Sequence, residues 1–297
     1  MALVDLLSGN QGILIAFASV LGLLVGSFLN VVVYRLPIML QREWRAQCCE
    51  FLEIENISPD PSGSTDFKTF NLIKPESHCP HCHAPVKPWQ NIPVISYLML
   101  GAKCANCQVK IPKRYPAVEA ITGLLSALVV YTYGFDWVSL AALVFTWSLI
   151  ALTLIDFDHQ LLPDNVTIPL LWLGLLVGYL DLGLVPLGDA VIGAIAGYLV
   201  LWIFYWSFKL LTGKEGMGYG DFKLLAALGA WLGWQSLLPI IILSSMAGAV
   251  IGMGMILLFK RDRSIPMPFG PYLAIAGFIM LIWGPQLTSM YVNGFLG

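Results

Sequence analysis

Long apolar stretches recur along most of the chain, and short polar segments separate them. A helix needs about 20 consecutive apolar residues to cross the hydrocarbon layer of a bilayer. We therefore predict an all-α polytopic membrane protein with about eight transmembrane helices. They are expected at residues 12–34, 117–134, 138–157, 165–182, 188–210, 221–236, 238–259 and 270–292.

The longest polar segment lies between the first two apolar stretches, over residues 35–116. Within it, residues 40–76 are mixed in charge and rich in Ser, Pro and Glu, which is typical of an inserted loop. The pattern predicts a first transmembrane helix within residues 1–34, a cytoplasmic loop domain over 35–116 and a transmembrane core over 117–297.

Composition agrees with a membrane location. Of the 297 residues, 58% are hydrophobic and only 11% are charged, whereas soluble domains carry about 25% charged residues. A secretory signal peptide begins with positive charge, but residues 1–12 contain no Lys or Arg. The first apolar stretch is therefore expected to be retained. No basic patch is interleaved with aromatic residues, so we expect no nucleic-acid partner.

The basic residues indicate an orientation in the membrane. Ten of the sixteen Lys and Arg residues lie within 35–116, and with eight spans the other six fall on the same side. The connections on the opposite side, at 134–137 and 181–189, contain none. Because Lys and Arg concentrate on the cytoplasmic side, both termini are expected outside, and Asp156 and Asp221 at cytoplasmic helix ends.

Asp156 and Asp221 stand at the ends of two different apolar stretches. An ionisable side chain next to hydrocarbon is costly, and it marks a functional site by default. Two such acids from different helices are able to share one proton, which is the chemistry of aspartyl proteases. Asp158 competes with Asp156, but two residues along a helix is roughly the opposite face. Asp164 is more simply explained as an N-terminal helix cap.

For two other charged residues near the predicted spans, the sequence allows two interpretations. Lys223 either tunes the acid pair or contacts substrate, or it extends its ammonium to the membrane edge. Glu119 is either functional, because intramembrane glutamates are rare, or the partner of Arg114.

Four cysteines form two C-x-x-C pairs with 21 residues between the inner cysteines. This spacing is typical of a zinc site, and a reducing cytoplasm disfavours the alternative of a redox disulfide. A complete set of four thiolates leaves no open coordination position, so one structural zinc per chain is expected. Nearby His78, His81 and His83 are expected outside the ligand set, and Cys48 and Cys49 as reduced thiols. The predicted ligands are Cys79, Cys82, Cys104 and Cys107.

The run Gly218-Tyr219-Gly220-Asp221 has the G-x-G-D signature of intramembrane aspartyl proteases. Together with residues 156–164 and the four cysteines, it makes the chain resemble the type IV prepilin peptidases. The segments 26–37, 91–94 and 114–119 also resemble that family. The resemblance extends from about residue 22 to the last helix, and residues 40–76 are the part left unmatched.

This resemblance implies a bifunctional enzyme of the bacterial inner membrane. Such an enzyme removes the basic leader of prepilins and type II secretion pseudopilins on the cytoplasmic side. It then methylates the new N-terminal amine with S-adenosylmethionine. The resemblance assigns catalysis to Asp156 and Asp221 and zinc binding to the four cysteines. The chain has no Gly-rich strand-to-helix turn for the methyl donor, and residues 91–101 are the region expected to serve it.

Two other classes of protein fit parts of the pattern. A transporter or channel also places acids among its helices for proton coupling, and Asp→Glu changes would then preserve function. A membrane scaffold that uses the zinc site for protein contacts would tolerate Asn at both Asp156 and Asp221.

Overall fold

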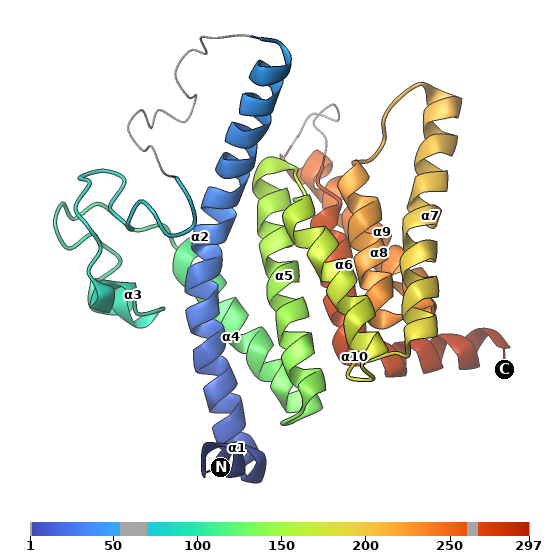
Figure 1. The fold of residues 1–297 in the computed structure, drawn as a ribbon, viewed down its shortest axis with the longest axis horizontal. Helices are drawn as coiled ribbons and strands as arrows, with labels where there is room; N and C mark the ends of the chain where they lie inside the picture. The colour runs from blue at the N-terminus through green and yellow to red at the C-terminus, as the bar shows by residue number, and fades with distance from the viewer. Residues whose placement is uncertain (1, 54–69, 260–266, 297) are drawn as a thin grey trace. The chain divides into compact units, whose positions relative to one another are not determined.

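The computed structural model is helical, and it describes residues 2–53, 70–259 and 267–296 (Figure 1). Within these residues, six helices are long and apolar enough to cross a membrane by length and composition. The α-helices are α1 (Ala2–Gly9), α2 (Gln11–Phe51), α3 (Ile95–Met99), α4 (Arg114–Tyr133), α5 (Trp137–His159), α6 (Asp164–Tyr179), α7 (Leu187–Thr212), α8 (Tyr219–Leu232), α9 (Leu237–Phe259) and α10 (Gly270–Leu296). Short 3-10 turns, η1 (Pro88–Asn91) and η2 (Trp234–Ser236), complete the described elements.

Each of the eight predicted spans corresponds to a helix, but two of these helices are short. Helix α6 has 16 residues and α8 has 14, below the usual length of about 20 for a span. By length and composition, the described part of the chain therefore supports six spans rather than eight.

Helix α2 continues well past the predicted end of the first span at residue 34. It runs for 41 residues and contains Pro37 without ending there. The expectation that residues 40–51 belong to a loop is wrong. These residues are rich in Leu, Gln, Arg, Glu and Ala, which have high helix propensity, and this local preference outweighs their polarity. The rest of the predicted insertion, residues 54–69, lies outside the described residues.

The chain divides into two compact units, residues 15–128 and residues 1–14 together with 129–297. In the first unit, α2 packs closely against α4. A Cβ atom on Gly26 would lie 2.7 Å from the Cα of Glu119, so the two backbones approach as small residues allow in membrane helix pairs. Residues 70–113 of this unit contain only α3, η1 and two isolated β-bridges.

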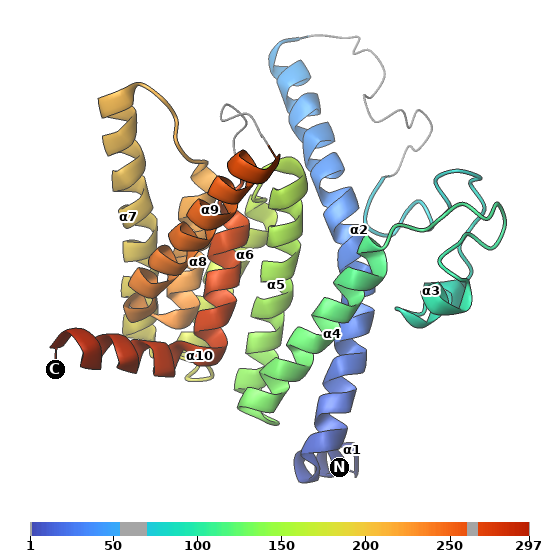
Figure 2. The same cartoon turned by 180° about the vertical axis from the view of Figure 1, so that it is seen from behind.

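The second unit is a bundle in which α8 contacts α6, α7, α9 and α10 (Figures 1 and 2). From Asp221 to Leu232, every α8 residue except Lys223 is buried, as expected of a helix inside a bundle rather than on its surface. Helices α7 and α8 cross where a Cβ atom on Gly193 would collide with the backbone carbonyl of Gly229. On another side, Trp231 Nε1 donates a hydrogen bond of 2.8 Å to the Leu170 carbonyl of α6.

Candidate active site

Asp156 lies in the last turn of α5 and is 5% exposed. The helix ends just after it because Gln160 takes a left-handed conformation and donates its N–H to the Asp156 carbonyl at 2.9 Å. Its neighbour Asp158 is exposed. The two acids therefore lie on opposite faces of α5, as predicted: Asp156 is buried in the bundle and Asp158 is exposed.

Asp221 lies in the first turn of α8 and is 6% exposed. Gly218 precedes the helix as its N-cap residue, and the Asp221 N–H donates to the Gly218 carbonyl at 3.3 Å. The first turn of a helix favours a negative charge because its backbone N–H groups are unpaired there. The G-x-G-D run therefore places the Asp221 carboxyl in the first turn of α8, a helix whose residues are mostly buried.

The structure brings Asp156 and Asp221 together, and we call them the acid pair. Their carboxyls are close enough to interact electrostatically. Leu162 connects their surroundings: a Cβ atom on Gly220, next to Asp221, would lie 2.7 Å from the Leu162 Cβ. A Cβ atom on Gly270 would lie 3.1 Å from Leu162 Cδ1 and 2.6 Å from Asp156 Oδ2. The acid pair thus sits where α5, α8 and the start of α10 meet.

One oxygen of the acid pair has an unused hydrogen-bonding capacity. Within the described residues, Asp156 Oδ2 is buried and has no hydrogen-bond partner. Buried carboxylate oxygens are normally satisfied, and an exception requires an explanation such as a catalytic role. A reacting water or substrate group bound here would satisfy this oxygen.

Asp164 and Lys223 form an ion pair, which neither prediction anticipated. Lys223 Nζ lies 2.7 Å from each carboxylate oxygen of Asp164. Asp164 is the first residue of α6, whose N-cap is Pro163, so the predicted capping role is wrong. Whether Lys223 also tunes the acid pair or contacts substrate stays a prediction. It joins α8 to α6, two residues after Asp221.

The four cysteines of the C-x-x-C pairs converge on one point. Their sulfur atoms all lie within 4.8 Å of one another, with Cys79–Cys107 at 3.8 Å and Cys82–Cys104 at 4.0 Å. In a tetrahedral site with Zn–S bonds of about 2.3 Å, neighbouring sulfurs are about 3.8 Å apart. The observed cluster therefore has the size of a four-thiolate zinc site.

The two C-x-x-C pairs are built alike, although 21 residues separate them. The residue after each pair, His83 and Gln108, has a positive φ of 57° and 59°. Each donates its N–H to the carbonyl of the first cysteine, at 2.9 and 3.1 Å. Hydrogen bonds, first from the Asn106 side chain and next from the Ala84 backbone, lower the pKa of the Cys82 thiol to about 6. A metal ion binds thiolates rather than thiols, and the convergence of four sulfurs makes this loop suited to one.

Glu119 accepts a hydrogen bond of 2.8 Å from the backbone N–H of Val94 and is 9% exposed. It therefore connects α4 to the segment that begins α3. Val94 has a φ of 59°, which is rare for a β-branched residue and is held only by surrounding contacts. The carboxylate supplies one of those contacts, and both interpretations of Glu119, a functional group or a partner of Arg114, stay predictions.

Comparison with known proteins identifies the family. Residues 20–133 match the bacterial peptidase A24 N-terminal domain, and residues 143–253 match the type IV leader peptidase family. The chain is 54% identical over 294 residues to the prepilin leader peptidase/N-methyltransferase of Aeromonas hydrophila, covering 99% of each chain. The chain belongs to the prepilin leader peptidase family.

Other relatives give the same result. The prepilin leader peptidase/N-methyltransferase of Pseudomonas aeruginosa is 52% identical over 293 residues, covering 99% of this chain and 98% of the relative. That of Neisseria gonorrhoeae is 50% identical over 266 residues, covering 90% and 89%. No solved structure matches the chain. The resemblance seen in the sequence is confirmed, and the transporter and scaffold alternatives are set aside.

The leader peptidase match includes both members of the acid pair, and the N-terminal match includes all four cysteines. Sequence reasoning missed Gly270, which touches Asp156. The signal for it was weak: a glycine directly before Pro271, at the start of the last apolar stretch, also fits an ordinary helix start.

Proposed function

We propose that this chain removes the leader peptide from prepilins and type II secretion pseudopilins, and then methylates the new N-terminal amine. The observation that carries the proposal is the acid pair, two buried carboxyls from α5 and α8 in a chain of the prepilin leader peptidase family. The names of the full-length relatives support both activities.

Peptide hydrolysis requires a base to activate water and an acid to protonate the leaving amine. Two close carboxyls cannot both ionise cheaply, so Asp156 and Asp221 hold one proton between them and supply both roles. The ionised member takes a proton from water as the water oxygen attacks the scissile carbonyl. The protonated member donates to that carbonyl oxygen. As the carbon–nitrogen bond breaks, one member of the pair protonates the departing nitrogen while a hydroxyl of the tetrahedral intermediate returns its proton to the other member, which restores the single shared proton.

Methylation requires a separate donor, S-adenosylmethionine. The methyl group moves from its sulfonium sulfur to the neutral N-terminal amine, which then releases a proton. The residues that bind the donor are proposed to lie in the cysteine-bearing loop, around residues 91–101. One structural zinc ion, bound by Cys79, Cys82, Cys104 and Cys107, organises that loop because its described part has little secondary structure of its own.

We further propose that the protein lies in the bacterial inner membrane with eight spans, counting the short helices α6 and α8. The burial of α8 by its neighbours supports this count, because a helix enclosed by others need not match the full bilayer thickness. The cysteine-bearing segment between α2 and α4 and the acid pair then face the cytoplasm. A prepilin whose basic leader precedes an apolar helix would present its cleavage point at that depth.

One assay tests both activities. The purified protein in lipid is incubated with a prepilin and labelled S-adenosylmethionine, and the product is followed by mass spectrometry. We expect loss of the leader, followed by gain of one methyl group. A preparation that is folded but leaves the prepilin intact would contradict the proposal.

A further inference from the structure

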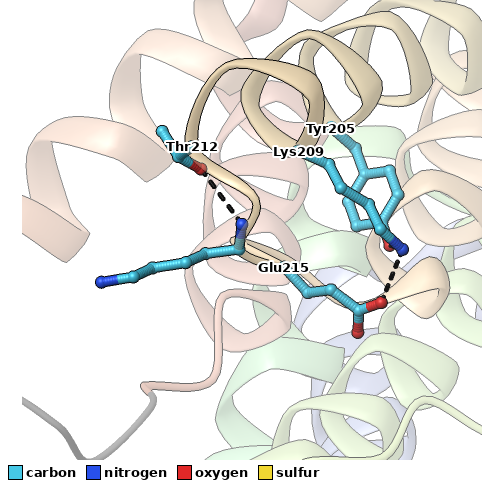
Figure 3. A network of polar contacts seen from close by, with 5 residues as sticks. Tyr205, Lys209, Thr212 and Glu215 are labelled. Carbon is cyan, nitrogen blue, oxygen red and sulfur yellow. Dashed lines mark hydrogen bonds and ion pairs between the residues drawn. The ribbon is translucent and has the colours of Figure 1, made fainter.

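The loop over 213–218, which precedes α8 and Asp221, is connected to the end of α7 by a polar network (Figure 3). Lys209, near the end of α7, donates hydrogen bonds to Glu215 Oε1 at 2.7 Å and to the Tyr205 hydroxyl at 3.2 Å. Glu215 belongs to the loop over 213–218, six residues before Asp221. The loop is therefore attached by a side chain as well as by the backbone.

The same network reaches the residues on both sides of Asp221. The ring of Tyr205 lies 5.2 Å from that of Tyr219 and 5.6 Å from that of Phe222, centroid to centroid. Tyr205 is 1% exposed and Phe222 is fully buried. Because Phe222 directly follows Asp221, the position of the Tyr205 ring constrains the turn that presents the carboxyl.

The backbone of the loop has little freedom to take another path. Gly213 ends α7 in a left-handed conformation, with φ of 69°. Gly216 passes so close to α7 that a Cβ atom there would lie 2.9 Å from the Phe208 ring. Between these points, Glu215 is the loop residue whose side chain is held by α7, and Lys209 lowers the pKa of its carboxyl through their hydrogen bond. The ion pair is therefore charged at neutral pH.

Stability alone does not explain this arrangement. The side chains of Lys209 and Glu215 are 33% and 67% exposed, and exposed ion pairs contribute at most about 1 kcal/mol. Lys209 also lies 5.5 Å from the ring centroids of Tyr205 and Trp206. Its ammonium is thus fixed between a buried ring and a loop carboxylate, an arrangement suited to setting the loop's geometry.

We propose that Lys209, Tyr205 and Glu215 are positioning residues for Asp221. They hold the loop over 213–218 so that the Asp221 carboxyl meets Asp156 at the distance that hydrolysis requires. They are proposed to act through this loop and not by contact with the scissile bond. This inference rests on the proposed function, because it gives Asp221 its catalytic role.

The test compares Glu215→Gln, Lys209→Met and the double variant, with Lys214→Met as the matched control. Lys214 is an exposed lysine of the same loop whose backbone, not its side chain, bonds to Thr212. Leader cleavage, methylation of a supplied mature peptide and the thermal midpoint are measured for each. We expect kcat for cleavage to fall by about tenfold in each single variant, since misplaced catalytic groups are costly. KM, methylation and the midpoint stay near the parent values.

The double variant separates a network from two independent effects. If the two residues act through one ion pair, its kcat equals that of the single variants instead of the product of their losses. Lys214→Met should cleave as the parent does. Parent-like kcat in both single variants, with Asp221→Asn inactive, would overturn the inference and leave the proposed function standing. A parallel loss of cleavage, methylation and thermal midpoint would also overturn it, because the network would then only stabilise the fold. Normal cleavage by Asp221→Asn would instead overturn the proposed function.

Discussion

At the residue scale, Gly270 is the position where the acid pair has least room. A Cβ atom there would lie 2.6 Å from Asp156 Oδ2, well inside van der Waals contact. The carboxyl is the end of a side chain, so it would move aside rather than block the helix. A methyl group at this position is therefore expected to displace Asp156 Oδ2 while leaving the bundle intact.

We predict that Gly270→Ala lowers leader cleavage by at least about tenfold. Methylation of a supplied mature peptide should continue, since it requires different groups. Gly254→Ala on α9 is the control, because a Cβ atom at Gly254 meets nothing within 4 Å. Cleavage by Gly270→Ala at the parent rate would show that Asp156 does not act from the position described.

Side-chain chemistry at this scale was only partly predictable. Asp156 and Asp221 were selected as candidate site residues from their places at the ends of apolar stretches, because a carboxyl next to hydrocarbon is costly. The pairing of Lys223 with Asp164 was not found. It joins residues 59 positions apart, and no local pattern along the chain encodes which exposed charges meet.

At the element scale, the crossing of α7 and α8 sets where Asp221 is held. Gly193 and Gly229 face each other there with no space for a side chain on either. We predict that Gly193→Ala destabilises the protein by about 1–3 kcal/mol, the usual cost of overpacking. The thermal midpoint of the protein in lipid measures this. Gly188→Ala, on the same helix but facing open space, should leave the midpoint unchanged, and equal midpoints for both variants would refute this account of the crossing.

The proposed zinc ion is expected to stabilise the cysteine-bearing loop, which has little regular secondary structure. Within residues 70–113 the described secondary structure is limited to short helices and two isolated bridges. We predict one zinc ion per chain by elemental analysis. It should be lost on Cys→Ser substitution at any of positions 79, 82, 104 and 107, with new protease cleavage in this loop. Cys48→Ser and Cys49→Ser should retain it. Purified protein without zinc, yet with an intact loop, would contradict a structural metal.

The apolar pattern predicted which stretches are helical more accurately than it predicted where each helix ends. All eight predicted stretches are helical, because length and hydropathy suffice to predict a buried helix. The end of α2 was missed by 17 residues, since its polar continuation keeps the helix propensity but not the hydropathy by which the span was recognised. The shortness of α6 and α8 likewise depends on turns at Leu180 and Gly233 that hydropathy does not report.

At the scale of the whole molecule, the proposed orientation rests on the distribution of sixteen basic residues. We predict that a phosphatase reporter, which is active only outside the cytoplasm, is active when fused after residue 135 or 183. It should be inactive after residue 214. A fluorescent reporter that matures only in the cytoplasm serves as the complementary control. Phosphatase activity after residue 214 would place the Asp221 loop outside and would contradict cytoplasmic leader cleavage.

The central claim is that two carboxyls from separate helices perform the hydrolysis as one pair. The most direct measurement follows leader loss and methyl gain by mass spectrometry for Asp156→Asn and Asp221→Asn, each alone. Asn keeps the shape of Asp but cannot exchange the shared proton, so cleavage should fall by about a thousandfold or more. A supplied mature peptide should still be methylated. Asp158→Asn, on the exposed side of α5, should cleave within about twofold of the parent. Leader removal at the parent rate by either Asp156→Asn or Asp221→Asn would contradict the account.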